Sequence, residues 1–176
     1  YSHFSGVGRL SDQPDFQLAE PPPYPIDDAA VHHVFEGGWV WVLRFNNGIT
    51  SAGVSATDAV ASQLGLSEGA AAWERLLALI PALREQFAGA QAERPFTHIP
   101  QLSFRSAAIA GSRWALLPSA AGFVDPLLST GFPITLLGIA RLAEAMEAGW
   151  RVELLADYAA RTERELLATA RLIGGL

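Results

Sequence analysis

The segment best suited to chemistry covers Arg113–Gly131, with the sequence RWALLPSAAGFVDPLLSTG. An apolar run and a turn of small residues lead to an Asp-Pro pair at Asp125, and Ser129–Gly131 then precedes a helical pattern. The first N–H groups of a helix lack partners within the helix, and the helix dipole is positive at this end. The segment therefore predicts a helix start that receives an anion, and Gly131 allows a planar ring to approach the backbone.

Two tryptophans and two histidines form a second group of candidates. Trp39 and Trp41 lie two residues apart in a β-rich stretch, so they share one face of a strand. Such a pair forms either part of a core or the wall of a ligand pocket. The adjacent His32 and His33 must point to opposite faces, and no carboxylates at ligand spacing accompany them, so we expect no metal site. One of the two histidines, taken as His33, is expected to line a substrate cavity.

Arg44 and Arg105 are candidates for binding an acidic group, either a carboxylate or a phosphate. Structural and surface roles are commoner for arginine and remain the alternative. The sequence contains no readable Ser-His-Asp arrangement, because Ser129 lacks the glycine-flanked pattern of a nucleophile elbow. Catalytic residues are therefore not assigned.

The elements that must position these residues begin with a β-rich half. Residues 1–28 contain the run PPPYP and are expected to form an irregular connection, partly polyproline II. Val31–Phe35, Trp39–Phe45 and Ile49–Val54 are rich in β-branched and aromatic residues and are separated by glycine-containing turns. These stretches predict three antiparallel strands in a meander.

A helical pattern follows over Ser67–Ala88, where apolar residues recur at three- and four-residue spacing. Ser67 is the expected N-cap of this helix, and Pro81 is expected to kink it or split it in two. Short strands are expected within Phe96–Ala110, and the apolar run Trp114–Leu117 predicts a buried strand.

Two further helices are predicted over Pro133–Ala148 and Val152–Ile173. On the exposed side of the second, Arg161 is expected to pair with both Asp157 and Glu165 at four-residue spacing. The residues expected to form its buried stripe are Val152, Leu155, Tyr158, Thr162 and Leu166.

Composition excludes several classes of function. The 176 residues carry a net charge of −6, the twelve basic residues are all arginine, and there is no cysteine. The arginines are scattered, so no basic patch for nucleic acid is expected, and the chain itself offers no lysine or thiolate chemistry. Cysteine-free usage fits a cytoplasmic protein, and no apolar run reaches the roughly 18 residues that a membrane span requires. Half the residues are hydrophobic, so we expect the excess apolar surface to face another part of the same protein.

Two motifs resemble those of the FAD-dependent halogenases and related aromatic monooxygenases. Gly122–Gly131 (GFVDPLLSTG) is similar to the flavin-contacting motif Gly-Phe-x-Asp-Pro-x-x-Ser-x-Gly of that family. Gly38–Leu43 (GWVWVL) resembles the Trp-x-Trp-x-Ile-Pro signature of the halogenases, and the strand Thr50–Val54 follows it as it often does there. The resemblance extends from about Ala30 to Arg171.

Some positions depart from the family pattern. Leu43-Arg44 stands where the halogenases have Ile-Pro, and Pro118-Ser119 stands where the family has Gly-Asp, whose aspartate binds the ribityl chain. Leu128 occupies a position where tryptophan halogenases carry glutamate, which makes the chain more similar to the phenol- and pyrrole-directed branch. The family's dinucleotide-binding Gly-x-Gly-x-x-Gly motif and its lysine between flavin and substrate are absent, so we expect a fragment that lacks that N-terminal region.

The resemblance implies an α+β fold: an antiparallel sheet with a helical insertion at 59–88 and two C-terminal helices, as part of a p-hydroxybenzoate-hydroxylase-like flavoprotein fold. Residues 1–112 would form the substrate-binding region and 113–176 the C-terminal part of the FAD-binding domain. The sites implied for FAD are Ser119, Phe123, Asp125, Pro126, Ser129, Thr130 and Gly131. Those expected to bind substrate are His33, Trp39, Trp41, Arg44 and Arg105.

The implied chemistry is oxidation of an aromatic or other electron-rich small molecule through a flavin C4a-hydroperoxide, with halide as a possible co-substrate. A separate flavin reductase would supply reduced FAD, and the N–H groups of Thr130 and Gly131 would help to bind halide or flavin. Two alternatives stay open. One is a flavin-dependent reductase of the geranylgeranyl-reductase type, and the other is a non-catalytic small-molecule-binding domain.

Overall fold

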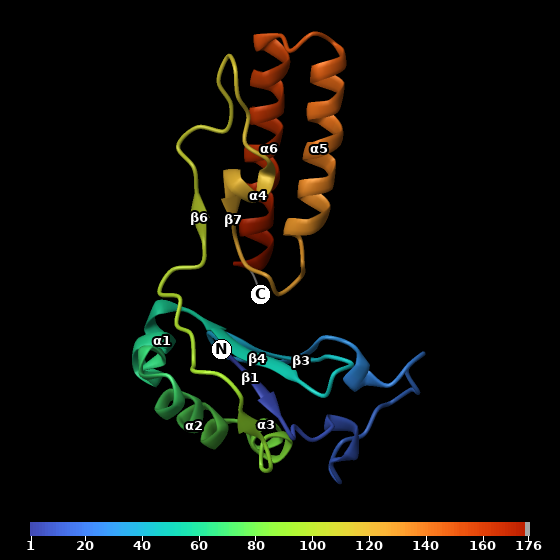
Figure 1. The fold of residues 1–176 in the computed structure, drawn as a ribbon, viewed down its shortest axis with the longest axis vertical. Coiled ribbons are helices and arrows are strands. Elements are labelled where there is room, and N and C mark those ends of the chain that lie inside the picture. Colours follow the sequence, from blue (N-terminus) through green and yellow to red (C-terminus); the bar gives the residue numbers. More distant parts are fainter. Residues whose placement is uncertain (175–176) are drawn as a thin grey trace. The chain divides into compact units, whose positions relative to one another are not determined.

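The computed structural model describes residues 1–174, which fall into two units, Tyr1–His98 and the part from Ile99 onward (Figure 1). The boundary lies before the one expected after residue 112. Strand β6 (Phe104–Arg105) pairs with strand β7 (Gly122–Phe123), and this pairing joins the intervening segment to the C-terminal helices. Each unit mixes helices with antiparallel strands, as the α+β assignment predicted.

The first unit contains a five-stranded antiparallel sheet in the order β2-β3-β4-β1-β5. The predicted meander is confirmed as its first three strands. Strand β1 was not predicted, because its four residues, Ser2–Ser5, lie within the segment that was expected to be irregular. The strands are β1 (Ser2–Ser5), β2 (Val31–Phe35), β3 (Gly38–Arg44), β4 (Thr50–Ala56) and β5 (Gln91–Ala92).

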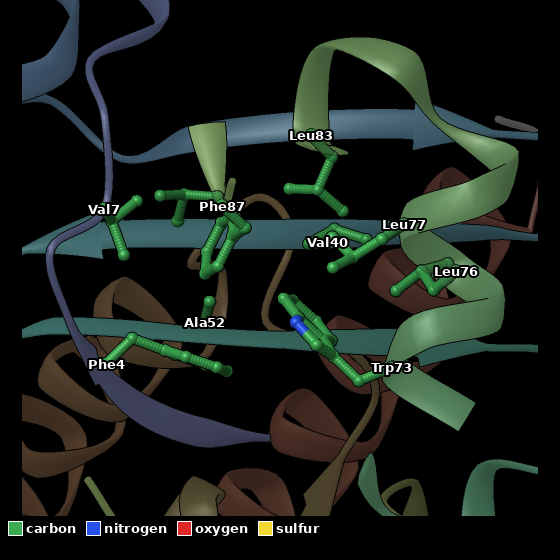
Figure 2. Close-up of a cluster of buried hydrophobic side chains, with 10 residues drawn as sticks. Phe4, Val7, Val40, Ala52, Trp73, Leu76, Leu77, Leu83 and Phe87 are labelled. Atoms are coloured by element: carbon green, nitrogen blue, oxygen red, sulfur yellow. The ribbon is translucent and has the colours of Figure 1, made fainter. Parts of the chain in front are cut away.

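Helices cover one face of this sheet and form its core. Val40 and Val42 of β3 and Ala52 of β4 point toward the helical layer and are fully buried there. Figure 2 shows Trp73, Leu76 and Leu83 reaching this face from the helices. The helical layer consists of α1 (Asp58–Leu64), α2 (Ala70–Leu79) and α3 (Pro81–Gln86).

Pro81 splits the predicted helix, as expected: α2 ends at Leu79, Ile80 adopts an extended conformation, and Pro81 is the first residue of α3. The predicted N-cap at Ser67 is wrong. Ser67 lies within a short 3-10 helix, Leu66–Glu68, and α2 begins after Gly69, whose positive φ of 61° no β-branched residue would readily adopt. The chain turns twice at glycine where the sequence pattern suggested a continuous helix.

The second unit is built on an antiparallel helical pair, α5 (Gly131–Glu147) and α6 (Val152–Ile173) (Figure 1). A four-residue helix, α4 (Pro118–Ala121), packs beside them. The strand predicted at Trp114–Leu117 is wrong. A single bridge joins Ala110 to Ala115, and Trp114 is 46% exposed. The apolar run therefore has no sheet in which to pair, since α4 begins directly after it.

The buried stripe of α6 matches the prediction from Leu155 to Leu166, but it begins later and extends further. Val152 is exposed at the helix start, whereas Thr169 is buried near the end. Arg161 pairs with Asp157 at 2.8 Å, as expected. Glu165 instead binds Arg141 of α5, because it faces the neighbouring helix. Among residues 1–174, no helix is long and apolar enough to cross a membrane.

Candidate functional site

A pocket of about 410 Å³ lies at the end of the helical pair where α5 begins. Its walls come from α4, the segment between β7 and α5, the first turn of α5, and α6. All seven residues predicted to contact the cofactor line it, which the sequence motif could predict because they are close in the chain. They are Ser119, Phe123, Asp125, Pro126, Ser129, Thr130 and Gly131.

The turn before α5 holds its shape through its own hydrogen bonds. The Asp125 carboxylate accepts the backbone N–H of Leu127 at 2.8 Å, and the N–H of Ser129 donates to the carbonyl of Pro126 at 2.9 Å. This arrangement is an Asx turn followed by a tight reversal. Ser129 has a φ of 52°, in the left-handed region, and this reversal directs the chain into the helix.

The start of α5 exposes unsatisfied donors to the pocket. No side chain caps the helix at Thr130. Within residues 1–174, the N–H groups of Thr130 and Gly131 donate to no backbone carbonyl, whereas those of Phe132 and Ile134 donate to Ser129 and Thr130, both at 3.3 Å. With Pro133 lacking an N–H, the two free amides are the positive end of a 17-residue helix.

Two glycines one heptad apart on α5 explain where the pocket lies. Residues seven positions apart occupy nearly the same side of a helix. At Gly138 this side is filled, because an added Cβ would overlap the ring of Pro118 in α4. At Gly131 an added Cβ would have no atom within 4 Å. Helix α4 therefore packs against α5 at Gly138 and leaves the start of α5 open. Ser119 of α4 is one of the residues that line the pocket there.

Helix α6 closes the pocket on another side, which the sequence did not predict. Leu166 and Thr169 line it, together with Ile134 and Thr135 from α5. One feature of the sequence could have indicated the role of α6 in the pocket: the buried stripe of this helix continues from Leu166 to the hydroxyl residue Thr169. The sequence could not show that Thr169 lies beside the motif, because about forty residues separate the two along the chain.

Trp39 and Trp41 share the face of the sheet that is opposite to the helical layer, as predicted. Their ring centroids are 5.7 Å apart, and His32 meets Trp39 edge-on at 5.0 Å. The indole N–H of Trp41 donates to the hydroxyl of Ser51 at 3.3 Å. Gly53 is required beneath this group, because a Cβ there would overlap the Trp41 ring.

His33 does not join the tryptophans. It pairs with Val40 across β2 and β3, so its side chain lies on the helix-covered face, where its Nε2 lies 2.8 Å from the amide oxygen of Gln86. Burial lowers the pKa of His33. Alternation along the strand places His32 on the aromatic face instead. The sequence did not show which face the helices cover, so it could not show that His32, and not His33, accompanies the tryptophans.

The structure gives both candidate arginines protein partners. Arg44 lies on the helix-covered face and donates to the carbonyl oxygens of Val7 at 2.9 Å and Gly8 at 3.1 Å. Arg105 lies in the second unit, 3.5 Å from Glu163, with both side chains more than half exposed. Arg44 therefore has a structural role and Arg105 a surface ion pair, which matches the alternative to binding an acidic ligand. In the described part of the chain, no cluster of three or more potential metal-ligating side chains occurs.

Curated proteins similar to this chain are halogenases. Tetracycline 7-halogenase of Kitasatospora aureofaciens is 32% identical over 142 residues, which cover 77% of this chain and 25% of that protein. Monodechloroaminopyrrolnitrin halogenase PrnC of Pseudomonas fluorescens is 31% identical over 177 residues, covering 95% of this chain and 30% of its own length. The chain therefore spans between a quarter and a third of these relatives. No family profile matches the chain.

Solved structures similar to this chain are also halogenases. Halogenase PltM superposes with a TM-score of 0.80 at 28% identity, covering 98% of this chain and 36% of that protein. A similar likeness, with a TM-score of 0.78, is found for PltM in complex with phloroglucinol and FAD. The chondrochloren halogenase CndH, at 21% identity and a TM-score of 0.70, shares the fold.

Proposed function

Because the chain belongs to the FAD-dependent halogenase family, we propose that its second unit forms the part of an FAD site that faces the flavin ring. The observation that carries this proposal is the pocket at the start of α5, lined by the whole GFVDPLLSTG motif except its two leucines. The parent protein would be an oxidoreductase that halogenates an electron-rich, aromatic small molecule.

The residues present fit the ring end of FAD. The free amides of Thr130 and Gly131 suit the N1–O2 edge, where a reduced flavin ring carries negative charge. The open space at Gly131 admits a planar group against the backbone, and Phe123 offers an apolar wall. Ser119, on the rim, would bind a ribityl hydroxyl more weakly than the aspartate of the family pattern.

When bound and reduced, the flavin would supply the two electrons that activate oxygen, and the activated oxygen would then accept two electrons from halide. The chain's own contribution is to position and to stabilise charge. The α5 dipole favours the anionic ring and could also hold a halide ion beside Thr130 and Gly131. A separate flavin reductase would provide the reduced cofactor, in keeping with the family assignment.

The aromatic face of the first unit is proposed as a wall of the substrate site. Trp39, Trp41 and His32 present ring surfaces that suit a flat, electron-rich substrate. The presence of phloroglucinol in a PltM complex supports a phenolic substrate class. His32 replaces His33 in this proposal, because His32 shares the face of the tryptophans.

Flavin binding by the purified chain tests the proposal. Titration with FAD and with riboflavin should quench flavin fluorescence with dissociation constants within about threefold of each other, because the pocket contacts the ring and the chain contributes no pyrophosphate loop. Absence of saturable binding by either flavin would contradict the proposed site.

The reaction is tested in a protein that contains this chain together with the rest of the flavin fold. Reduced FAD, oxygen and bromide should convert an electron-rich phenol or pyrrole into a brominated product detectable by mass spectrometry. A hydroxylated product with no bromide dependence would instead identify a monooxygenase, and a saturated double bond in an alkene substrate would identify a reductase.

A further inference from the structure

Helix α6 places a largely buried threonine in the wall of the same pocket, more than thirty residues beyond the flavin motif in the chain. Thr169 is 9% exposed and lines the pocket together with Leu166, one turn earlier. Within residues 1–174, its hydroxyl has no protein hydrogen-bond partner. A hydroxyl group in a pocket wall that has no protein partner is available to a ligand or a water molecule.

Thr169 lies at the same end of the helical pair as the free amides of α5, so the two can bind one ligand. The two helices are antiparallel, so the start of α5 and the end of α6 lie at the same end of the pair (Figure 1). The amides of Thr130 and Gly131 are donors only, whereas a threonine hydroxyl both donates and accepts. The pocket therefore offers fixed donors from one helix and one adaptable group from the other.

We propose that Thr169 is a flavin-positioning residue that hydrogen-bonds the polar pyrimidine edge of the ring, while the start of α5 receives the same ring at its amides. This inference rests on the proposed function. The pyrimidine edge of a flavin alternates carbonyl acceptors with an N–H donor, so it needs both a donor-only and a dual partner. Leu166 contacts the ring beside it and excludes water from this hydrogen bond.

A second threonine of α6 provides a matched control. Thr162 is fully buried, and its side chain interacts with that of Tyr158 on the same helix. It lies two turns before Thr169 on the same stripe but does not line the pocket. Replacing either threonine by valine removes one hydroxyl and keeps the side-chain shape, so the two variants differ mainly in access to the ligand.

The test is titration of riboflavin into the whole chain, followed by flavin fluorescence, with thermal unfolding measured in parallel. T169V should weaken binding about fivefold and shift the visible absorption band of the bound flavin, because one hydrogen bond to the ring is lost. T169S should stay within about twofold of the unsubstituted chain, because it keeps the hydroxyl group. T162V should leave the dissociation constant unchanged.

The outcomes separate this inference from the proposed function. If the unsubstituted chain binds no riboflavin, the proposed function fails and this inference fails with it. If it binds riboflavin and T169V binds equally well, the inference alone is overturned. Equal weakening by T162V and T169V would also overturn it, because the effect would then come from the packing of α6.

Discussion

Single residues decide whether the start of α5 is open or closed. Gly131 and Gly138 occupy the same side of the helix, yet one faces open space and the other faces Pro118. Neither has a positive φ, so the difference between them is one of space alone. A methyl group added at each position should therefore act on binding at the first and on stability at the second.

Gly131→Ala should leave the fold intact, with a thermal midpoint equal to or above that of the unsubstituted chain, because alanine favours helix by up to about 1 kcal/mol over glycine. The same change should weaken flavin binding at least tenfold, since the methyl group occupies the approach of the ring. Calorimetry and fluorescence titration measure the two effects. Unchanged flavin affinity would show that the ring does not lie against this residue.

Gly138→Ala is the control, because it adds the same methyl group on the same side of α5. The overlap with Pro118 should lower the free energy of unfolding by about 1–3 kcal/mol. Denaturant unfolding measures this loss. A stability equal to that of Gly131→Ala would contradict the close packing of α4 against α5.

Asp27 should make the stability of the first unit pH-dependent. This side chain is 1% exposed, and its carboxylate accepts the N–H groups of Leu10 at 2.7 Å and Ser11 at 3.1 Å. Burial raises the pKa of Asp27, but the hydrogen bonds from Ser11 and Leu10 and the charge of Arg44 outweigh it, so the pKa lies below its ordinary value.

A lowered folded-state pKa means that the unfolded chain binds the proton more readily. The stabilisation is therefore complete above the ordinary aspartate pKa of about 4 and is lost as the pH falls through the lower folded-state value. Asp27→Asn should lower stability at neutral pH by about 1–2 kcal/mol and flatten the acid limb of the stability curve. A variant whose acid limb matches that of the unsubstituted chain would rule out this role for Asp27.

At the scale of elements, the second unit depends on α6 contacting the segment before α4. Tyr158 is buried, and its hydroxyl donates to the carbonyl oxygen of Leu116 at 2.6 Å. This bond holds a stretch that forms no strand. Tyr158→Phe should lower the free energy of unfolding by about 1–2 kcal/mol, because the partly buried carbonyl of Leu116 loses its partner.

The control for Tyr158→Phe in thermal unfolding is Tyr24→Phe. Tyr24 is 58% exposed, and its hydroxyl makes no hydrogen bond to residues 1–174. The second variant should unfold as the unsubstituted chain does. Equal midpoints for both variants would show that the Leu116 contact does not stabilise the unit.

The sequence predicted elements where a local pattern was decisive. The meander from Val31 and the helix Val152–Ile173 follow from periodicity, and Pro81 split its helix as proline must. It failed at Trp114, where an apolar run meets no neighbouring strand. It also could not show that His33 lies under the helices and His32 beside the tryptophans, because this depends on which surface the helices cover. Both outcomes depend on tertiary contacts that no local pattern contains.

At the scale of the whole molecule, apolar surface on α5 is the main feature left without a role in the described chain. Phe132, Leu136 and Met146 are each more than half exposed. The curated relatives extend well beyond the matched region, since the chain covers 25–30% of their length. Exposed apolar patches of this kind lower solubility in isolation.

The double variant Leu136→Gln and Met146→Gln should therefore reduce binding of a hydrophobic dye and concentration-dependent self-association. Thermal stability should change by less than about 0.5 kcal/mol, because both side chains already contact solvent. Dye fluorescence and sedimentation velocity measure the outcome. A large loss of stability would mean that these side chains pack within the unit.

At the same scale, the sequence could predict only part of the pocket that is proposed to bind flavin. The motif residues are contiguous, so the sequence alone assembled Phe123 through Gly131 into one site. Thr169 enters the pocket through the antiparallel return of α6, and this requires the helical pair to be formed. The Trp39 face belongs to the other unit, and its role as a substrate wall remains a proposal.

The most direct test of the central claim follows the backbone amides of the ¹⁵N-labelled chain by nuclear magnetic resonance as riboflavin is added. The amides of Thr130 and Gly131 should show the largest shifts, with smaller changes around Phe123 and Thr169. Shifts that leave the start of α5 unaffected, or that arise elsewhere in the chain, would contradict the claim that this helix start receives a flavin ring.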